Sequence, residues 1–134
     1  MATWLLSWLE QQHIDRACLV GHSLGSLIAL EAAAQAPERV EKLALLGAAV
    51  PMPVAARLLD TAATNPPRAM ATVNRGSHSI RGWLAAPSPV GLWAPGMNLR
   101  LMERQPAQGL HRDLSACNAY RNGLIAASRV RCPV

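Results

Sequence analysis

The chain has 134 residues, of which 51% are hydrophobic and 16% are charged. This balance indicates a globular chain with a real core and excludes an intrinsically disordered one. The net charge of +5 is concentrated after residue 56 and would suit an anionic substrate or an acidic carrier. The arginines of the chain are scattered singly without interleaved aromatic residues, so the sequence does not predict a nucleic-acid interface.

The first twenty residues predict an amphipathic helix followed by a buried strand. Thr3 can cap a helix whose apolar face carries Trp4, Leu5, Trp8 and Leu9. No basic segment precedes these apolar residues, so a signal peptide is not expected. After a polar connection, the unbroken apolar run over 17–20 predicts a parallel strand that is buried on both faces.

The central motif is a G-x-S-x-G pattern between this strand and an apolar helix: Gly21, His22, Ser23, Leu24 and Gly25. A serine on a sharp strand-to-helix turn has a strained backbone and an exposed hydroxyl, which is the geometry of a nucleophile elbow. Helix and strand pass close together there, so small residues are expected two positions before and after the serine, where Gly21 and Gly25 stand. The Leu24 N–H would point at a developing oxyanion. The alternative is an ordinary glycine turn at a strand end.

The following segments predict a second strand and then a helical insertion. The helix over 24–35 ends before Pro37, and residues 40–46 predict the next strand of a βαβ crossover. Beyond Pro53, helices are expected over 54–63, over 67–73, over 98–103 and from Asp113 or Ser115 to Ala127. The uncharged stretch over 82–99 could line an acyl pocket or form a lid, or simply pack on the core. Its prolines and glycines argue against a membrane-spanning helix.

Residues 14–52 resemble the centre of an α/β-hydrolase. The segments 17–20, 24–35 and 42–46 are similar to its fifth strand, the helix after the elbow and the sixth strand, and 118–124 and 130–134 to the last cap helix and the run into the seventh strand. The resemblance implies an α/β fold with a partial hydrolase core in residues 1–52, a helical cap in 53–129 and the start of the next core strand in 130–134. The chain would be a central fragment of that fold.

The resemblance also implies a serine hydrolase of the esterase type. It would act on a small-molecule carboxylic ester or related acyl bond through an acyl-enzyme on Ser23, with Leu24 as oxyanion donor. Gly21, His22 and Gly25 would be structural parts of the elbow. A serine at this position argues against the haloalkane dehalogenases and epoxide hydrolases, which place aspartate there.

The triad of this family runs in the order serine, acid, histidine. His13 precedes the elbow strand and lies at its wrong end, and the ring of His22 would point away from Ser23 on the turn. The remaining candidates lie in the predicted cap and are His78, His111, Asp60 and Asp113. We expect the acid and the histidine beyond Val134 and the second oxyanion donor before Met1, so that the chain alone is truncated and inactive. The alternative is a non-catalytic, hydrolase-like remnant that acts as a binding or assembly module.

The remaining expectations concern cofactors and location. No metal or organic cofactor is expected, and neither nucleic acid nor a membrane is expected as a partner. Cys18, Cys117 and Cys132 are odd in number and lack metal-site spacing, which indicates reduced thiols and a cytoplasmic location.

Overall fold

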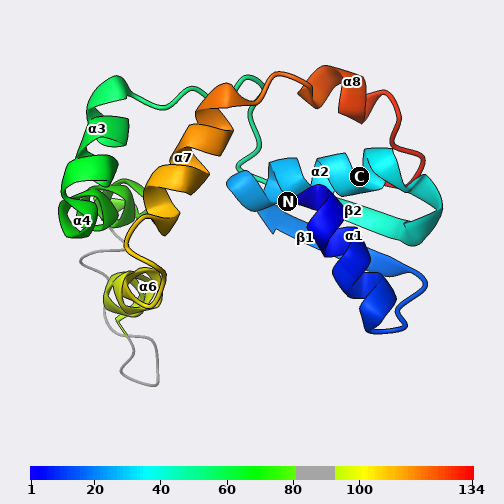
Figure 1. The fold of residues 1–134 in the computed structure, drawn as a ribbon, viewed down its shortest axis with the longest axis horizontal. Helices are drawn as coiled ribbons and strands as arrows, with labels where there is room; N and C mark the ends of the chain where they lie inside the picture. Colours follow the sequence, from blue (N-terminus) through cyan, green and yellow to red (C-terminus); the bar gives the residue numbers. More distant parts are fainter. Residues whose placement is uncertain (81–92) are drawn as a thin grey trace. The chain divides into compact units, whose positions relative to one another are not determined.

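A computed structural model describes residues 1–80 and 93–134, which form two compact units (Figure 1). One unit, called here the elbow unit, comprises Met1–Pro53 and Ala116–Val134, and the other, the helical unit, comprises Val54–Ser115. Residues 116–129, which the sequence assigned to the cap, thus pack with the elbow unit. The possible acyl pocket or lid over 82–99 falls mostly outside the described residues.

The elbow unit is built on a strand–helix–strand crossover. Its first elements are α1 (Ala2–Gln11), β1 (Ala17–His22), α2 (Leu24–Gln35), a 3₁₀ turn (Pro37–Arg39) and β2 (Val40–Leu46). The two strands pair in parallel, with Val20 opposite Ala44. Figure 1 shows α2 lying along the two-stranded sheet. This arrangement confirms the predicted α/β class.

The core of this unit lies between α2 and the sheet. Ala29, Leu30 and Ala33 from α2 pack against Val40 and Leu43 of β2. Alanine at two of the three helix positions lets the helix backbone come close to the sheet, and larger aliphatic side chains from β2 fill the remaining space.

Among the described residues, helices cover only one face of the sheet. Cys18 is exposed and Val20 is 75% exposed, whereas the alternate residue Leu19 packs against the core. The prediction that this strand is buried on both faces is therefore wrong. Parallel strands are buried when helices cover both faces, and here α2 covers one.

The first helix also differs from its prediction. It begins at Ala2 with Met1 as its N-cap residue and has no side-chain cap, so Thr3 is not the cap. Instead, the Thr3 hydroxyl donates to Gln35 at 3.4 Å. Leu9 is buried, but Trp4 is 70% exposed, so the predicted apolar face is only partly covered.

The helix that was predicted to reach Ala127 is interrupted. Two helices form in its place, α7 (Gly109–Ala119) and α8 (Gly123–Ala127). The chain turns at Tyr120 and Asn122, whose side chains both donate to Glu31 of α2. A Cβ on Gly123 would lie 2.7 Å from Cγ1 of Val50, so a larger residue at the first position of α8 would require Val50 or the helix to shift.

The last residues follow the outer edge of β2. The Leu43 N–H donates to the Pro133 carbonyl at 2.9 Å. This is a single hydrogen bond of the kind that a third strand would make, although residues 130–134 are not themselves a strand.

The helical unit contains α3 (Ala56–Thr64), α4 (Pro66–Gly76) and α6 (Ala94–Glu103), together with the first part of α7. The buried Asn74 side chain joins two of these helices: its Nδ2 donates to the Pro95 carbonyl, and its Oδ1 accepts from Asn98 Nδ2, both at 2.8 Å. Within residues 1–80 and 93–134, no helix combines the length and apolar character needed to cross a bilayer.

Candidate active site

Ser23 sits in a strained turn between β1 and α2. Its backbone has φ 53° and ψ −121°, outside the regions that non-glycine residues normally occupy. Two backbone hydrogen bonds of 2.9 Å hold the turn: Ser23 N–H donates to the Leu46 carbonyl, and Ser26 N–H donates to the Ser23 carbonyl. Such a conformation persists only when its surroundings impose it, and it is common at functional sites.

Gly21 makes this turn possible. A Cβ at Gly21 would lie 2.6 Å from Cα of Ser26 and would collide with the backbone of Gly25. A Cβ at Gly25 would meet no described atom within 4 Å. Strand and helix therefore cross at the backbone of Gly25, so a side chain at Gly21 would collide there, whereas the Cβ direction of Gly25 points away from the crossing.

Ser26 is a residue of the turn that sequence reasoning missed. It is fully buried, and its hydroxyl also donates to the Ser23 carbonyl. The available signal was a polar residue in the first turn of an otherwise apolar helix, where serine often bonds the backbone.

The arrangement supplies a nucleophile position and one oxyanion donor. The Ser23 side chain is exposed, and its hydroxyl makes no hydrogen bond to any described residue. Leu24 is the first residue of α2, so its N–H has no partner within the helix and points out of the helix N-terminus. When Ser23 attacks a carbonyl carbon, the Leu24 N–H and the helix N-terminus can stabilise the negative charge that develops on the carbonyl oxygen.

Within the elbow unit, no described histidine or carboxylate makes a hydrogen bond with the Ser23 hydroxyl. The ring of His22 lies beside Gly47: a Cβ at Gly47 would be 3.7 Å from His22 Nε2. His78 belongs to the helical unit, where its Nδ1 is 2.8 Å from the Asn74 carbonyl oxygen. His111, Asp60 and Asp113 lie in the same unit. Among the described residues, no group of three or more His, Cys, Asp or Glu side chains is arranged to hold a metal ion.

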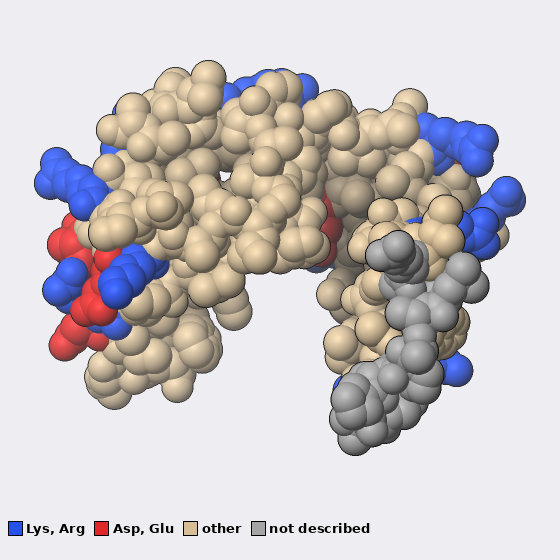
Figure 2. All heavy atoms as spheres, turned by 180° about the vertical axis from the view of Figure 1, so that it is seen from behind, with Lys and Arg blue, Asp and Glu red and all other residues tan. Residues whose placement is uncertain are grey.

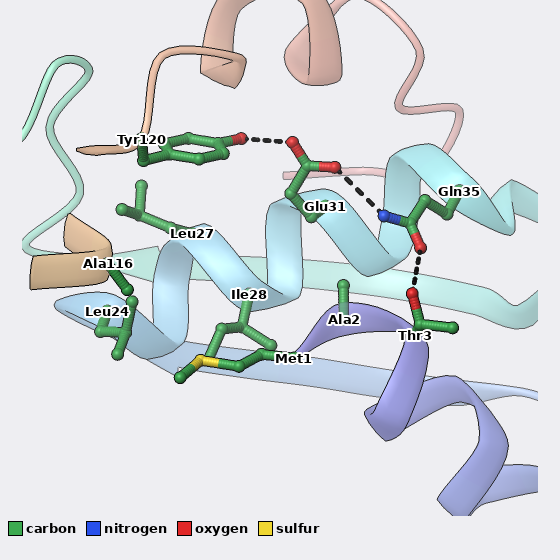
Figure 3. Close-up of a pocket in the computed structure, with 10 residues that line it drawn as sticks. All are labelled: Met1, Ala2, Thr3, Leu24, Leu27, Ile28, Glu31, Gln35, Ala116 and Tyr120. Carbon is green, nitrogen blue, oxygen red and sulfur yellow. Dashed lines mark hydrogen bonds between the residues drawn. The ribbon is translucent and has the colours of Figure 1, made fainter. Parts of the chain in front are cut away.

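A pocket of about 280 Å³ opens beside the elbow, on the exposed flank of α2 (Figure 3). Leu24, Leu27 and Ile28 give it an apolar wall, and Glu31 and Tyr120 close one side. Ser23 is not among the lining residues. The pocket therefore adjoins the elbow through Leu24 without containing the nucleophile.

A polar network fixes the far side of this pocket. Glu31 accepts from Tyr120 Oη at 2.7 Å, from Asn122 Nδ2 at 2.8 Å and from Gln35 Nε2 at 3.3 Å. Burial raises the pKa of Glu31, but these three hydrogen bonds and the charge of Arg129 outweigh it, so that the pKa lies below its ordinary value. Burial, followed by the Glu31 hydrogen bond and charge, raises the pKa of Tyr120, which therefore remains a donor at neutral pH.

Comparison with known families agrees with this geometry. A family model described as alpha/beta hydrolase fold matches residues 1–77, which include the elbow and both strands. The chain belongs to the α/β-hydrolase family. None of the curated proteins compared with it matches the chain. Members of this family are usually hydrolytic enzymes, and in this α/β-hydrolase the matched segment contains the Ser23 turn in full.

Proposed function

We propose that Ser23 is the nucleophile of a serine hydrolase that acts on a carboxylic ester or a related acyl bond. The observation that carries the proposal is the strained, exposed Ser23 directly before the first amide of α2. A positive φ at a serine needs a reason, and presenting a hydroxyl beside an oxyanion donor is one. The family match over residues 1–77 supports it.

The chemistry would run in two steps. Ser23 Oγ would attack the ester carbonyl carbon while its proton passes to a base, and the Leu24 N–H would stabilise the resulting oxyanion. The bond to the alcohol oxygen would then break, with a proton returned to that oxygen, leaving an acyl group on Ser23. Water would add to this acyl group, and its collapse would release the carboxylic acid and restore the hydroxyl.

The second candidate is a binding or assembly role without catalysis. It is favoured by one observation: in the described part of the elbow unit, neither a histidine nor a carboxylate bonds to the Ser23 hydroxyl. Serine without a base is a poor nucleophile. We therefore expect the 134-residue chain alone to be slower than a complete triad enzyme by on the order of 10⁴–10⁶ in turnover.

Ester turnover in the presence of added imidazole separates the two candidates. Imidazole can act as a general base from solution, so turnover of a short activated ester should rise with imidazole more steeply for the natural chain than for Ser23→Ala. The Ser23→Ala variant gives the background rate, at which imidazole attacks the ester directly. Identical imidazole dependence in both proteins would contradict the hydrolase proposal. Robust turnover without imidazole that vanishes in Ser23→Ala would instead assign the base to His78 or His111.

A further inference from the structure

Three arginines surround a groove between α3 and α4 of the helical unit. A hollow of about 390 Å³ is lined by Arg57, Arg68, Ala71, Thr72 and Arg75. An adjoining hollow of about 280 Å³ shares Arg57, Arg68 and Thr72 with it. No described residue that lines either hollow is acidic. The face of this unit that Figure 2 displays carries several basic side chains, drawn in blue.

Helix periodicity explains why these side chains converge. Arg68, Thr72 and Arg75 are spaced four and three residues apart, so they share one face of α4. Arg57 stands in the first turn of α3, the helix that packs against α4. Thr72 Oγ1 donates to the Arg68 carbonyl at 2.8 Å, so the guanidinium groups are the main donors that face the groove.

Two of the groove arginines, Arg57 and Arg68, form no ion pair with a described carboxylate. Within the described part of the chain, the ion pairs between side chains are Arg16–Glu41 and Arg100–Glu103, and neither involves Arg57 or Arg68. Like charges held in one groove raise the local potential and repel one another. An anion that enters the groove relieves this repulsion.

We propose that this arginine groove binds a small molecule that carries a diphosphate group. The planar guanidinium fork forms paired hydrogen bonds with phosphate oxygens. Arg57 and Arg68 line both adjoining hollows, so a ligand with two linked phosphate groups can place one group in each hollow while contacting the same pair of guanidinium groups. The volume of the larger hollow falls within the range of about 300–1,000 Å³ that is usual for small-molecule sites. This site lies in the helical unit and does not depend on the proposed chemistry of Ser23.

Titration calorimetry at low salt with inorganic pyrophosphate, inorganic phosphate and citrate tests the proposal. We expect pyrophosphate to bind more tightly than phosphate or citrate, and added salt to weaken it. Arg57→Gln and Arg68→Gln should each weaken pyrophosphate binding about tenfold, since each removes charged hydrogen bonds. Arg131→Gln, which removes the same charge from the elbow unit, is the matched control and should have little effect.

Several results would overturn the proposal. These are no binding of pyrophosphate, an equal loss in Arg131→Gln, tighter binding of citrate than of pyrophosphate, or binding of a single-stranded oligonucleotide in the absence of pyrophosphate binding. Both groove positions are exposed, so the glutamine variants should keep the helical circular dichroism of the natural chain.

Discussion

Replacing Ser23 with glycine should make the protein more stable while removing its nucleophile. A non-glycine residue in this part of conformational space costs about 1–3 kcal/mol. Glycine has no Cβ and adopts a positive φ without this cost. The Ser23 hydroxyl bonds to no described residue, so its removal leaves no buried group unpaired.

The magnitude follows from two opposing terms. Relief of the strain contributes about 1–3 kcal/mol, and the greater freedom of glycine in the unfolded chain removes about 0.4–1 kcal/mol. Compared with Ser23→Ala, which keeps a Cβ at φ 53°, the glycine variant should therefore gain about 1.3 kcal/mol, the difference between the midpoints of the two ranges. One kcal/mol corresponds to a rise in Tm of roughly 4–8 °C for a domain of 60–100 residues.

Urea unfolding and thermal melting, followed by circular dichroism, measure this difference. The alanine variant is the matched control, because it loses the same hydroxyl and keeps the strain. Equal stability of Ser23→Gly and Ser23→Ala would refute the argument that the turn is strained at this residue. A glycine variant less stable than the alanine variant would show that the backbone prefers another conformation there.

Two further predictions concern the packing of the turn and the network on α2. Gly21→Ala should destabilise the protein by about 1–3 kcal/mol, because its Cβ would overlap the backbone of α2. Gly25→Ala, the control, should not destabilise it. Equal effects of the two variants in denaturant unfolding would contradict the crossing of strand and helix at Gly25. The folded-state pKa of Glu31 lies below its ordinary value of 4.5, so its contribution to stability should be present above about pH 4.5 and lost as the pH falls through the folded-state pKa. Unfolding experiments between pH 3 and 7 should therefore show a difference in stability between the natural chain and Glu31→Gln that disappears at low pH. A difference that stays constant with pH would contradict this prediction, and so would the same pH dependence in Glu10→Gln.

Local patterns in the sequence predict the centre of the fold well. The helix over 24–35 and the strand over 40–46 were predicted with the bounds that the structure has. The elbow could be predicted because its requirements are short-range: an apolar strand, a small residue at Gly21, an exposed Ser23 and an apolar helix directly after it. The charge of Glu31 in that apolar helix was the signal for a polar network, and sequence reasoning did not use it.

Features that depend on distant residues could not be predicted in the same way. The break between α7 and α8 depends on Tyr120 Oη donating to Glu31, which is 89 residues earlier in the chain. The exposure of Cys18 and Val20 depends on which elements cover the sheet, and an apolar run alone cannot report that. The arginine groove requires α3 to lie against α4, so its three residues read as scattered surface charges in the sequence.

The most direct test of Ser23 as a nucleophile is covalent capture by an activated fluorophosphonate, located by peptide mass spectrometry. In this reaction the serine oxygen bonds to phosphorus, the phosphorus–fluorine bond breaks and hydrogen fluoride leaves. With imidazole present as a base, the Ser23 peptide should carry a larger share of the adduct than the peptide of exposed Ser7, because only Ser23 has an oxyanion donor beside it. Equal labelling of the two serines, or labelling that leaves Ser23 unmodified, would contradict the account.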